Sequence, residues 1–104
     1  MSTQDPIVIV AAKRTPMGGF MGGLSAVSAT TLGATAIRGA MQAANLSNDQ
    51  VDEVIMGCVL PAGLKQAPAR QAALEADLDL STACTTINKV CGSGMKAAMQ
   101  AHDA

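Results

Sequence analysis

The chain has 104 residues, of which 14% are charged, and a formal net charge of −1 at pH 7. This length allows at most one small domain, and the absence of a basic patch gives no indication of a nucleic-acid partner. Aromatic residues make up only 1% of the chain, so the core must consist of Ala, Val, Ile, Leu and Met. Because so small a unit buries little apolar surface per residue, we do not expect it to be stable by itself.

The N-terminal residues and the cysteines indicate in which cellular compartment the protein is located. Residues 1–5 lack the basic and then apolar pattern of a secretory signal, and no apolar run approaches the length of a membrane span. We therefore expect a cytoplasmic location and no membrane partner. The three cysteines, at positions 58, 84 and 91, cannot all pair and have no C-x-x-C spacing. We expect free thiols and no metal site.

The first predicted element is a strand over residues 7–12, which read Ile-Val-Ile-Val-Ala-Ala. Such a continuous apolar run is typical of a strand covered on both faces in a parallel sheet. Residues 17–24 contain Met-Gly-Gly twice, but without the spacing of a phosphate-binding loop. We interpret them as a flexible surface loop.

Helical spacing of apolar residues predicts an amphipathic helix over residues 29–44, with Asn45 as its terminator. Gly33 and Gly39 weaken an isolated helix, so we expect close packing against the sheet at both positions. Ser47, followed three places later by Gln50, predicts a capping box for a short helical turn.

The second half of the chain repeats the alternation of strand and helix. Residues 54–60 predict an apolar strand in which Cys58 has a packing role. Pro68 stands at a natural first position for a helix over residues 69–77 that has a face of small residues. Residues 84–90 predict the third strand, beginning at a structural Cys84. Arg70 and Glu75 are expected in solvent or at an interface.

This order of elements predicts an α/β fold. Three strands that alternate with three helices through short connections are typical of βαβ units in a mostly parallel sheet. Ligands of such sheets bind outside the carboxyl ends of the strands. The third strand delivers Cys91 to that edge.

The segment from Asn88 to Met99 is typical of a nucleophile site. A β-branched run precedes Cys91 and helix-forming residues follow it, so Cys91 falls where a strand turns into a helix. The unpaired N–H groups and dipole of a helix N-terminus favour the thiolate, which is the nucleophilic form of cysteine. The same N–H groups can stabilise the oxyanion formed when sulfur attacks a carbonyl. The alternative is that Cys91 is a small buried residue at a tight glycine turn.

His102, the chain's one histidine, is not a partner for this cysteine. It lies about three helical turns beyond Cys91, or roughly 16 Å at 1.5 Å per residue. A general base needs contact at about 2.6–3.2 Å, so we interpret His102 as a surface residue. A serine hydrolase is also excluded, because Ser93 lacks the glycines two places on either side that the G-x-S-x-G motif requires.

The residues Asn-Lys-Val-Cys-Gly-Ser-Gly-Met-Lys-Ala at 88–97 closely resemble the nucleophile motif of the thiolases, the acetyl-CoA C-acetyltransferases. Residues 7–20, with Arg-Thr-Pro at 14–16, and residues 66–74, reading Gln-Ala-Pro-Ala-Arg-Gln-Ala-Ala-Leu, resemble the same family in the same order. The resemblance covers essentially the whole chain. Ala67 stands where many thiolases carry Asn.

The resemblance implies a βαβαβα portion of the αβαβα-layered thiolase fold. Residues 1–104 would be the first part of a thiolase N-terminal domain that stops within the helix after the nucleophile. Cys91 would be the acyl-accepting nucleophile, and its backbone N–H would form part of an oxyanion hole. The substrates would be acyl-CoA molecules in fatty acid metabolism, with coenzyme A as substrate or product and no other cofactor. The full-length protein would be a homodimer or homotetramer.

Two alternatives to a thiolase remain open at this point. Another condensing enzyme, such as a ketoacyl synthase, would share the cysteine motif but not the Arg-Thr-Pro segment or the segment at 66–74. A fragment without catalysis could act only in assembly, through an exposed sheet edge. The second catalytic cysteine and the catalytic histidine of the family belong to later segments, so we expect no turnover from these residues alone.

Overall fold

The structure, a computed structural model, describes residues 6–104. The prediction about a signal pattern in residues 1–5 lies outside the described residues. The elements are helix α1 (Ala29–Ala44), a short 3-10 helix η1 (Asn48–Gln50), strand β1 (Glu53–Gly57), helix α2 (Pro68–Glu75), strand β2 (Ala83–Ile87) and helix α3 (Ser93–Asp103). No helix among the described residues has both the length and the apolar character needed to cross a membrane.

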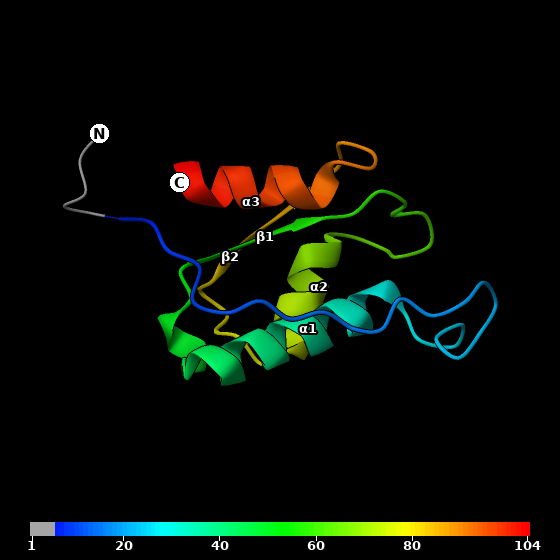
Figure 1. Cartoon of the computed structure of the whole chain (residues 1–104), viewed down its shortest axis with the longest axis horizontal. Helices are drawn as coiled ribbons and strands as arrows, with labels where there is room; N and C mark the ends of the chain where they lie inside the picture. The colour runs from blue at the N-terminus through cyan, green and yellow to red at the C-terminus, as the bar shows by residue number, and fades with distance from the viewer. Residues whose placement is uncertain (1–5) are drawn as a thin grey trace.

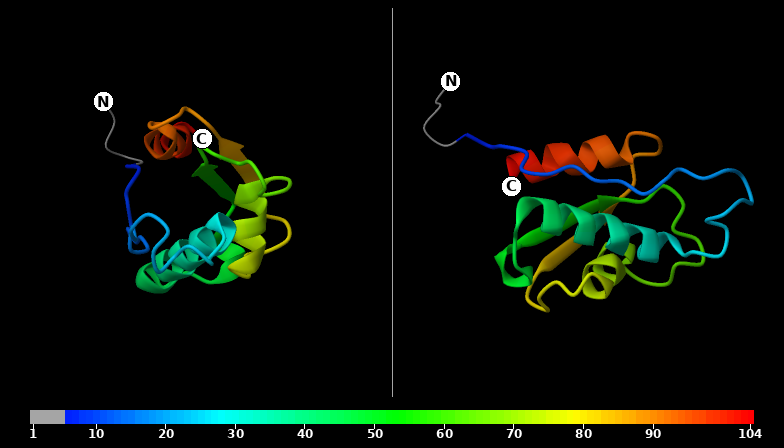
Figure 2. Two further views of the ribbon diagram at one scale, coloured as in Figure 1. Left: turned by 90° about the vertical axis from the view of Figure 1, so that its right-hand side faces the viewer. Right: turned by 60° about the horizontal axis from the view of Figure 1, so that its bottom comes forward.

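The elements form layers around a small parallel sheet. Strands β1 and β2 pair in parallel, with Glu53 opposite Ala83 and Gly57 opposite Ile87. Helix α3 covers one face of this sheet, and α2 lies on the other face with α1 packed beside it (Figures 1 and 2). The α/β class and the parallel pairing predicted from the sequence are confirmed.

Both ends of α1 are capped, and the terminator predicted at Asn45 is confirmed. The Ser28 hydroxyl accepts a hydrogen bond from the Thr31 N–H at 3.2 Å. Asn45 ends the helix in the left-handed region, at φ 54°, where asparagine is tolerated. The capping box of the next turn is also confirmed, since the Ser47 N–H donates to Gln50 Oε1 at 2.8 Å.

Small residues bring α1 and α2 together. A Cβ atom on Gly33 would lie only 3.2 Å from the Cβ of Ala72, which confirms the close packing expected at Gly33. Gly39 differs, because its nearest neighbour is the side chain of Lys13 in the N-terminal segment rather than the sheet. The buried apolar residues are nearly all alanines: Ala34, Ala69, Ala72, Ala73, Ala76, Leu78 and Ala97.

Arg70 and Glu75 have structural partners rather than only solvent contacts. The Arg70 guanidinium donates to the carbonyl oxygens of Thr82, at 2.9 Å, and Leu80, at 3.1 Å. These bonds fix the turn that leads into β2. Glu75 accepts a hydrogen bond from the Thr31 hydroxyl at 2.9 Å, so it joins the ends of α1 and α2.

The predicted strand over residues 7–12 is wrong. Its backbone is extended but pairs with no strand among residues 6–104. Its side chains are not covered either, and Ile9 is 90% exposed. Figure 2 shows the segment running past α1 and α3, away from the β1–β2 pair. An apolar β-branched run favours extended backbone, but a strand also needs a neighbour to accept and donate its hydrogen bonds.

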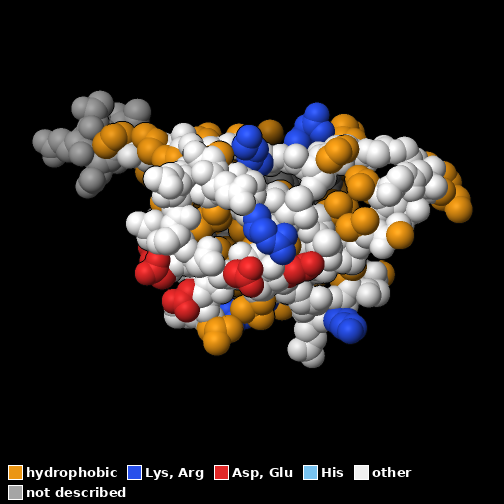
Figure 3. All heavy atoms as spheres, turned by 90° about the horizontal axis from the view of Figure 1, so that it is seen from below, with side chains coloured by type: hydrophobic (Ala, Val, Ile, Leu, Met, Phe, Trp, Pro, Cys, Tyr) orange, Lys and Arg blue, Asp and Glu red, His pale blue; other side chains and the backbone are white. Residues whose placement is uncertain are grey.

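The Gly-rich segment after it is a surface loop, as predicted. Residues 20–26 form a series of turns, and Met17, Phe20 and Met21 are largely exposed. Figure 3 shows hydrophobic side chains at several places on one face of the molecule, with acidic and basic side chains between them. Much of the apolar content of this chain therefore lies at the surface.

Candidate active site

The connection between β2 and α3 is a tight turn that carries Cys91. Val90 occupies the left-handed region at φ 49°, an unusual conformation for a β-branched residue. The Gly92 N–H donates to the Lys89 carbonyl and the Ser93 N–H donates to the Val90 carbonyl, both at 3.1 Å. Helix α3 then begins at Ser93. The predicted strand-to-helix corner at Cys91 is confirmed.

Two side chains close this turn. The Ser93 hydroxyl accepts from the Lys89 N–H at 2.8 Å and donates to the Val90 carbonyl at 2.6 Å. The Asn88 side chain accepts from the Val90 N–H at 2.9 Å and donates to the Val59 carbonyl at 3.1 Å. The last of these bonds ties the turn to the segment that follows β1.

The side chain of Cys91 is exposed, whereas Cys58 and Cys84 are half-buried. The alternative that Cys91 is a small buried residue is therefore wrong. All three cysteines are free thiols, as predicted. Of the three, Cys91 is the one whose sulfur a substrate could reach without a change in packing.

Backbone N–H groups at the start of α3 are available to a ligand. The first α-helical hydrogen bond of this segment runs from the Lys96 N–H to the Gly92 carbonyl, at 2.9 Å. Within residues 6–104, no backbone acceptor engages the N–H groups of Cys91, Gly94 or Met95. A Cβ atom on Gly94 would have no neighbour within 4 Å, so the space beside it is open. An exposed thiol thus stands next to unpaired donors that favour negative charge.

Gly57, the last residue of β1, was missed by the sequence analysis and supports the same corner. A Cβ atom there would lie 2.5 Å from the Ser93 carbonyl carbon and 2.7 Å from the Gly94 nitrogen. The first turn of α3 therefore rests directly on the backbone at the end of β1. A glycine inside an otherwise apolar strand is a signal of such close approach and could have revealed it.

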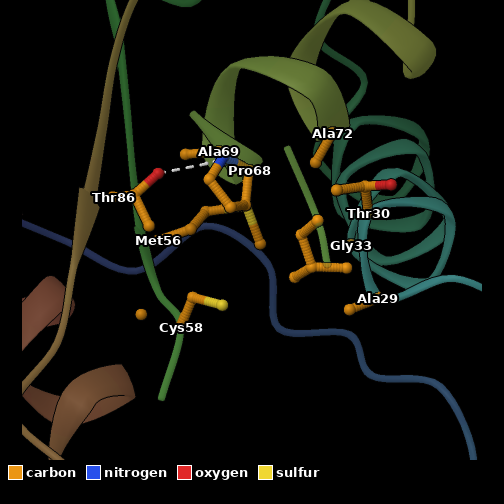
Figure 4. Close-up of a pocket in the computed structure, with 11 residues that line it drawn as sticks. Ala29, Thr30, Gly33, Met56, Cys58, Pro68, Ala69, Ala72 and Thr86 are labelled. Carbon is orange, nitrogen blue, oxygen red and sulfur yellow. Dashed lines mark hydrogen bonds between the residues drawn. The ribbon is translucent and has the colours of Figure 1, made fainter. Parts of the chain in front are cut away.

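A small cavity lies on the other side of β1, between the sheet and the N-terminal ends of α1 and α2 (Figure 4). Met56, Cys58 and Thr86 line it, and the Thr86 hydroxyl accepts a hydrogen bond from the Ala69 N–H at 2.9 Å. Its volume of ≈ 70 Å³ is far below the roughly 300 Å³ of ligand pockets. We interpret it as a packing gap, in keeping with the packing role predicted for Cys58.

His102 lies near the opposite end of α3 from Cys91, as its place in the sequence predicts. Its side chain is exposed, and its Nδ1 atom lies 3.0 Å from Asp103 Oδ1. The structure therefore confirms His102 as a surface residue and does not bring it to the cysteine.

Comparison with known proteins identifies the family. The family described as "Thiolase, N-terminal domain" matches residues 7–104. The mitochondrial acetyl-CoA acetyltransferase of Homo sapiens is 56% identical over 99 residues, which are 95% of this chain and 23% of the relative. The bovine (Bos taurus) protein of the same name is also 56% identical, with 95% and 24% covered. Acetyl-CoA acetyltransferase 2 of Arabidopsis thaliana is 57% identical over 93 residues, with 89% and 23% covered.

A solved structure agrees with these relatives. The crystal structure of Acat5 thiolase from Ascaris suum, in complex with coenzyme A, superposes with a TM-score of 0.88 at 37% identity. The match covers 92% of this chain and 25% of that one, so the chain spans about a quarter of the length of its relatives. The thiolase-like fold implied by the sequence motifs is confirmed. The chain belongs to the thiolase family, and its residues 7–104 correspond to part of the thiolase N-terminal domain.

Proposed function

We propose that Cys91 is the acyl-accepting nucleophile of an acetyl-CoA C-acetyltransferase. The observation that carries this proposal is the position of an exposed cysteine in the turn before α3, beside N–H groups that have no backbone acceptor in the described part of the chain. The names of the relatives, acetyl-CoA acetyltransferases from an animal and from a plant, support the same activity. They favour a thiolase over the ketoacyl synthase alternative.

In the first step, the Cys91 thiolate attacks the thioester carbonyl of acetyl-CoA. The bond between the carbonyl carbon and the coenzyme A sulfur breaks, and coenzyme A leaves as a thiolate that takes up a proton. The acetyl group is then held on Cys91 as a thioester. The Cys91 N–H, which has no backbone acceptor among residues 6–104, forms part of the oxyanion hole for the tetrahedral intermediate.

In the second step, a base removes a proton from the methyl group of another acetyl-CoA, and the resulting enolate attacks the Cys91 thioester. A carbon–carbon bond forms, acetoacetyl-CoA is released, and Cys91 returns to the thiolate. The reverse sequence cleaves a 3-ketoacyl-CoA. His102 is too far along α3 to act as this base, so the second step needs residues beyond these 104.

Coenzyme A enters this scheme only as substrate or product, and no other cofactor is required. A homodimer or homotetramer of the full-length protein and a cytoplasmic location stay predictions. The word "mitochondrial" in the names of several relatives counts against the location.

Acyl transfer can be tested with radiolabelled acetyl-CoA and peptide mapping. The 104-residue chain is compared with a chimera in which residues 7–104 replace the matched residues of the human relative. We expect label on the peptide that contains Cys91 in the chimera, condensation by the chimera, and no turnover by the chain alone.

Two control variants show which cysteine accepts the acetyl group. Cys91→Ser should abolish labelling, whereas Cys84→Ser, which changes a half-buried thiol, should leave it. Label on another cysteine, or a folded chimera without label on Cys91, would contradict the proposal.

A further inference from the structure

We propose that Ser93 is a positioning residue for Cys91, because its buried hydroxyl fixes the turn that presents the thiol. The inference rests on the proposed function for the role of Cys91, but its structural basis is independent. Ser93 is 2% exposed, and Thr82 is the other buried polar side chain among the described residues. A buried hydroxyl is retained only where its hydrogen bonds are made.

The two hydrogen bonds of the Ser93 hydroxyl span Cys91. Lys89 donates to it and Val90 accepts from it, both before the cysteine, while Ser93 itself follows the cysteine. One side chain therefore connects the two ends of the turn. Movement of the residues before Cys91 away from the N-terminus of α3 would break these bonds.

The turn needs such support because Val90 is strained. A β-branched residue is unfavourable at φ 49°, and the Val90 side chain is 64% exposed, so burial does not hold it there. Instead, both polar groups of its backbone are bound by side chains. Asn88 accepts from its N–H, and Ser93 donates to its carbonyl oxygen.

The contacts of the Ser93 hydroxyl should affect two reactions of Cys91, alkylation and acylation, to different degrees. Alkylation needs only an accessible thiol, and Cys91 is exposed. Acylation passes through an oxyanion, which needs the sulfur and the N–H donors in a fixed relative position. Without the Ser93 hydroxyl, we expect acylation to suffer much more than alkylation.

The test uses the chimera described above, which supplies the rest of the fold, with two small reagents, iodoacetamide as the alkylating agent and p-nitrophenyl acetate as the acyl donor. The rates at each cysteine are read by mass spectrometry of its peptide. In Ser93→Ala we expect the acylation rate of Cys91 to fall about tenfold, a modest part of the loss seen when an oxyanion donor is removed. Its alkylation rate should change less than about twofold, and Cys58 and Cys84 should react as in the chimera without the substitution.

Two variants serve as comparisons. Ser81→Ala removes an exposed hydroxyl that donates to Asp79 Oδ2 at 3.0 Å, and it should change neither rate. Asn88→Ala removes the other bond to Val90 from an exposed position. It should lower acylation selectively as well, and it keeps the test valid if Ser93→Ala does not fold.

The outcomes distinguish the two proposals. Equal losses of acylation and alkylation, or unchanged acylation in both Ser93→Ala and Asn88→Ala, would overturn the positioning role. Selective loss of acylation in these variants, with no transfer from acetyl-CoA to Cys91 in the chimera, would support the positioning role and reject the proposed function.

Discussion

Ala67 adopts a backbone conformation that is unfavourable for an alanine. It precedes α2 in the left-handed region, at φ 48° and ψ 67°, and makes no side-chain capping bond. The Cβ atom makes this region unfavourable for alanine by about 1–2 kcal/mol. Asparagine, which many thiolases carry here, tolerates the region better. The strain at this residue therefore comes from an alanine side chain in a backbone conformation that suits asparagine or glycine better.

Ala67→Gly is expected to stabilise the chain by roughly 1 kcal/mol, because glycine adopts positive φ without a steric penalty. The measurement is the free energy of unfolding in urea. Ala98→Gly is the matched control, since Ala98 is an exposed residue within α3, and it should cost about 1 kcal/mol. A loss of stability in Ala67→Gly would show that the left-handed conformation does not persist in solution.

At the scale of elements, the contact between the end of β1 and the start of α3 fixes the candidate site. A methyl group on Gly57 would meet backbone atoms of Ser93 and Gly94 rather than a movable side chain. Neither backbone can move away freely, because β1 is paired with β2 and the turn before α3 is closed by hydrogen bonds.

Gly57→Ala should therefore destabilise the chain by about 3 kcal/mol, at the upper end of overpacking effects. It should also increase iodoacetamide alkylation of the half-buried Cys58 beside it. Gly94→Ala makes the same chemical change within α3, where a Cβ atom has open space, and it should not lower the free energy of unfolding but raise it by up to about 1 kcal/mol. Similar effects of the two substitutions would show that α3 does not rest on β1.

The sequence predicted those elements that depend on local patterns. The helix over residues 29–44, its Asn45 terminator and the capping box at Ser47 all follow from short-range spacing, and the structure has them. Cys91 was found because a motif and a strand-to-helix change coincide there. Gly57 and the Ser93 hydroxyl were missed, because their importance depends on contacts between segments. Residues 7–12 were predicted wrongly for the same reason: composition indicates an extended segment but not its neighbour.

At the scale of the whole molecule, the balance between core and surface is unusual. The core consists almost entirely of alanines, and none of the large side chains that the structure describes is fully buried. Large apolar side chains are instead exposed, including the run from Ile7 to Val10. Since apolar burial provides most of the stability of a fold, this arrangement explains why we expect a marginal chain. It also favours association through the N-terminal segment, a different surface from the exposed sheet edge of the assembly alternative.

Ile9→Lys tests whether the exposed segment makes the isolated chain associate. Ile9 is 90% exposed, so its replacement should change the free energy of unfolding of the monomer by less than about 0.5 kcal/mol. A charge within the apolar run should nevertheless shift the chain from oligomers to monomers, as measured by size-exclusion chromatography with light scattering. Gln42→Lys adds the same charge at an exposed position of α1 and should leave the oligomers in place. If the parent chain is already monomeric at concentrations where Ile9→Lys is monomeric, association through this segment is ruled out, and its apolar side chains must be accommodated in water by the single chain.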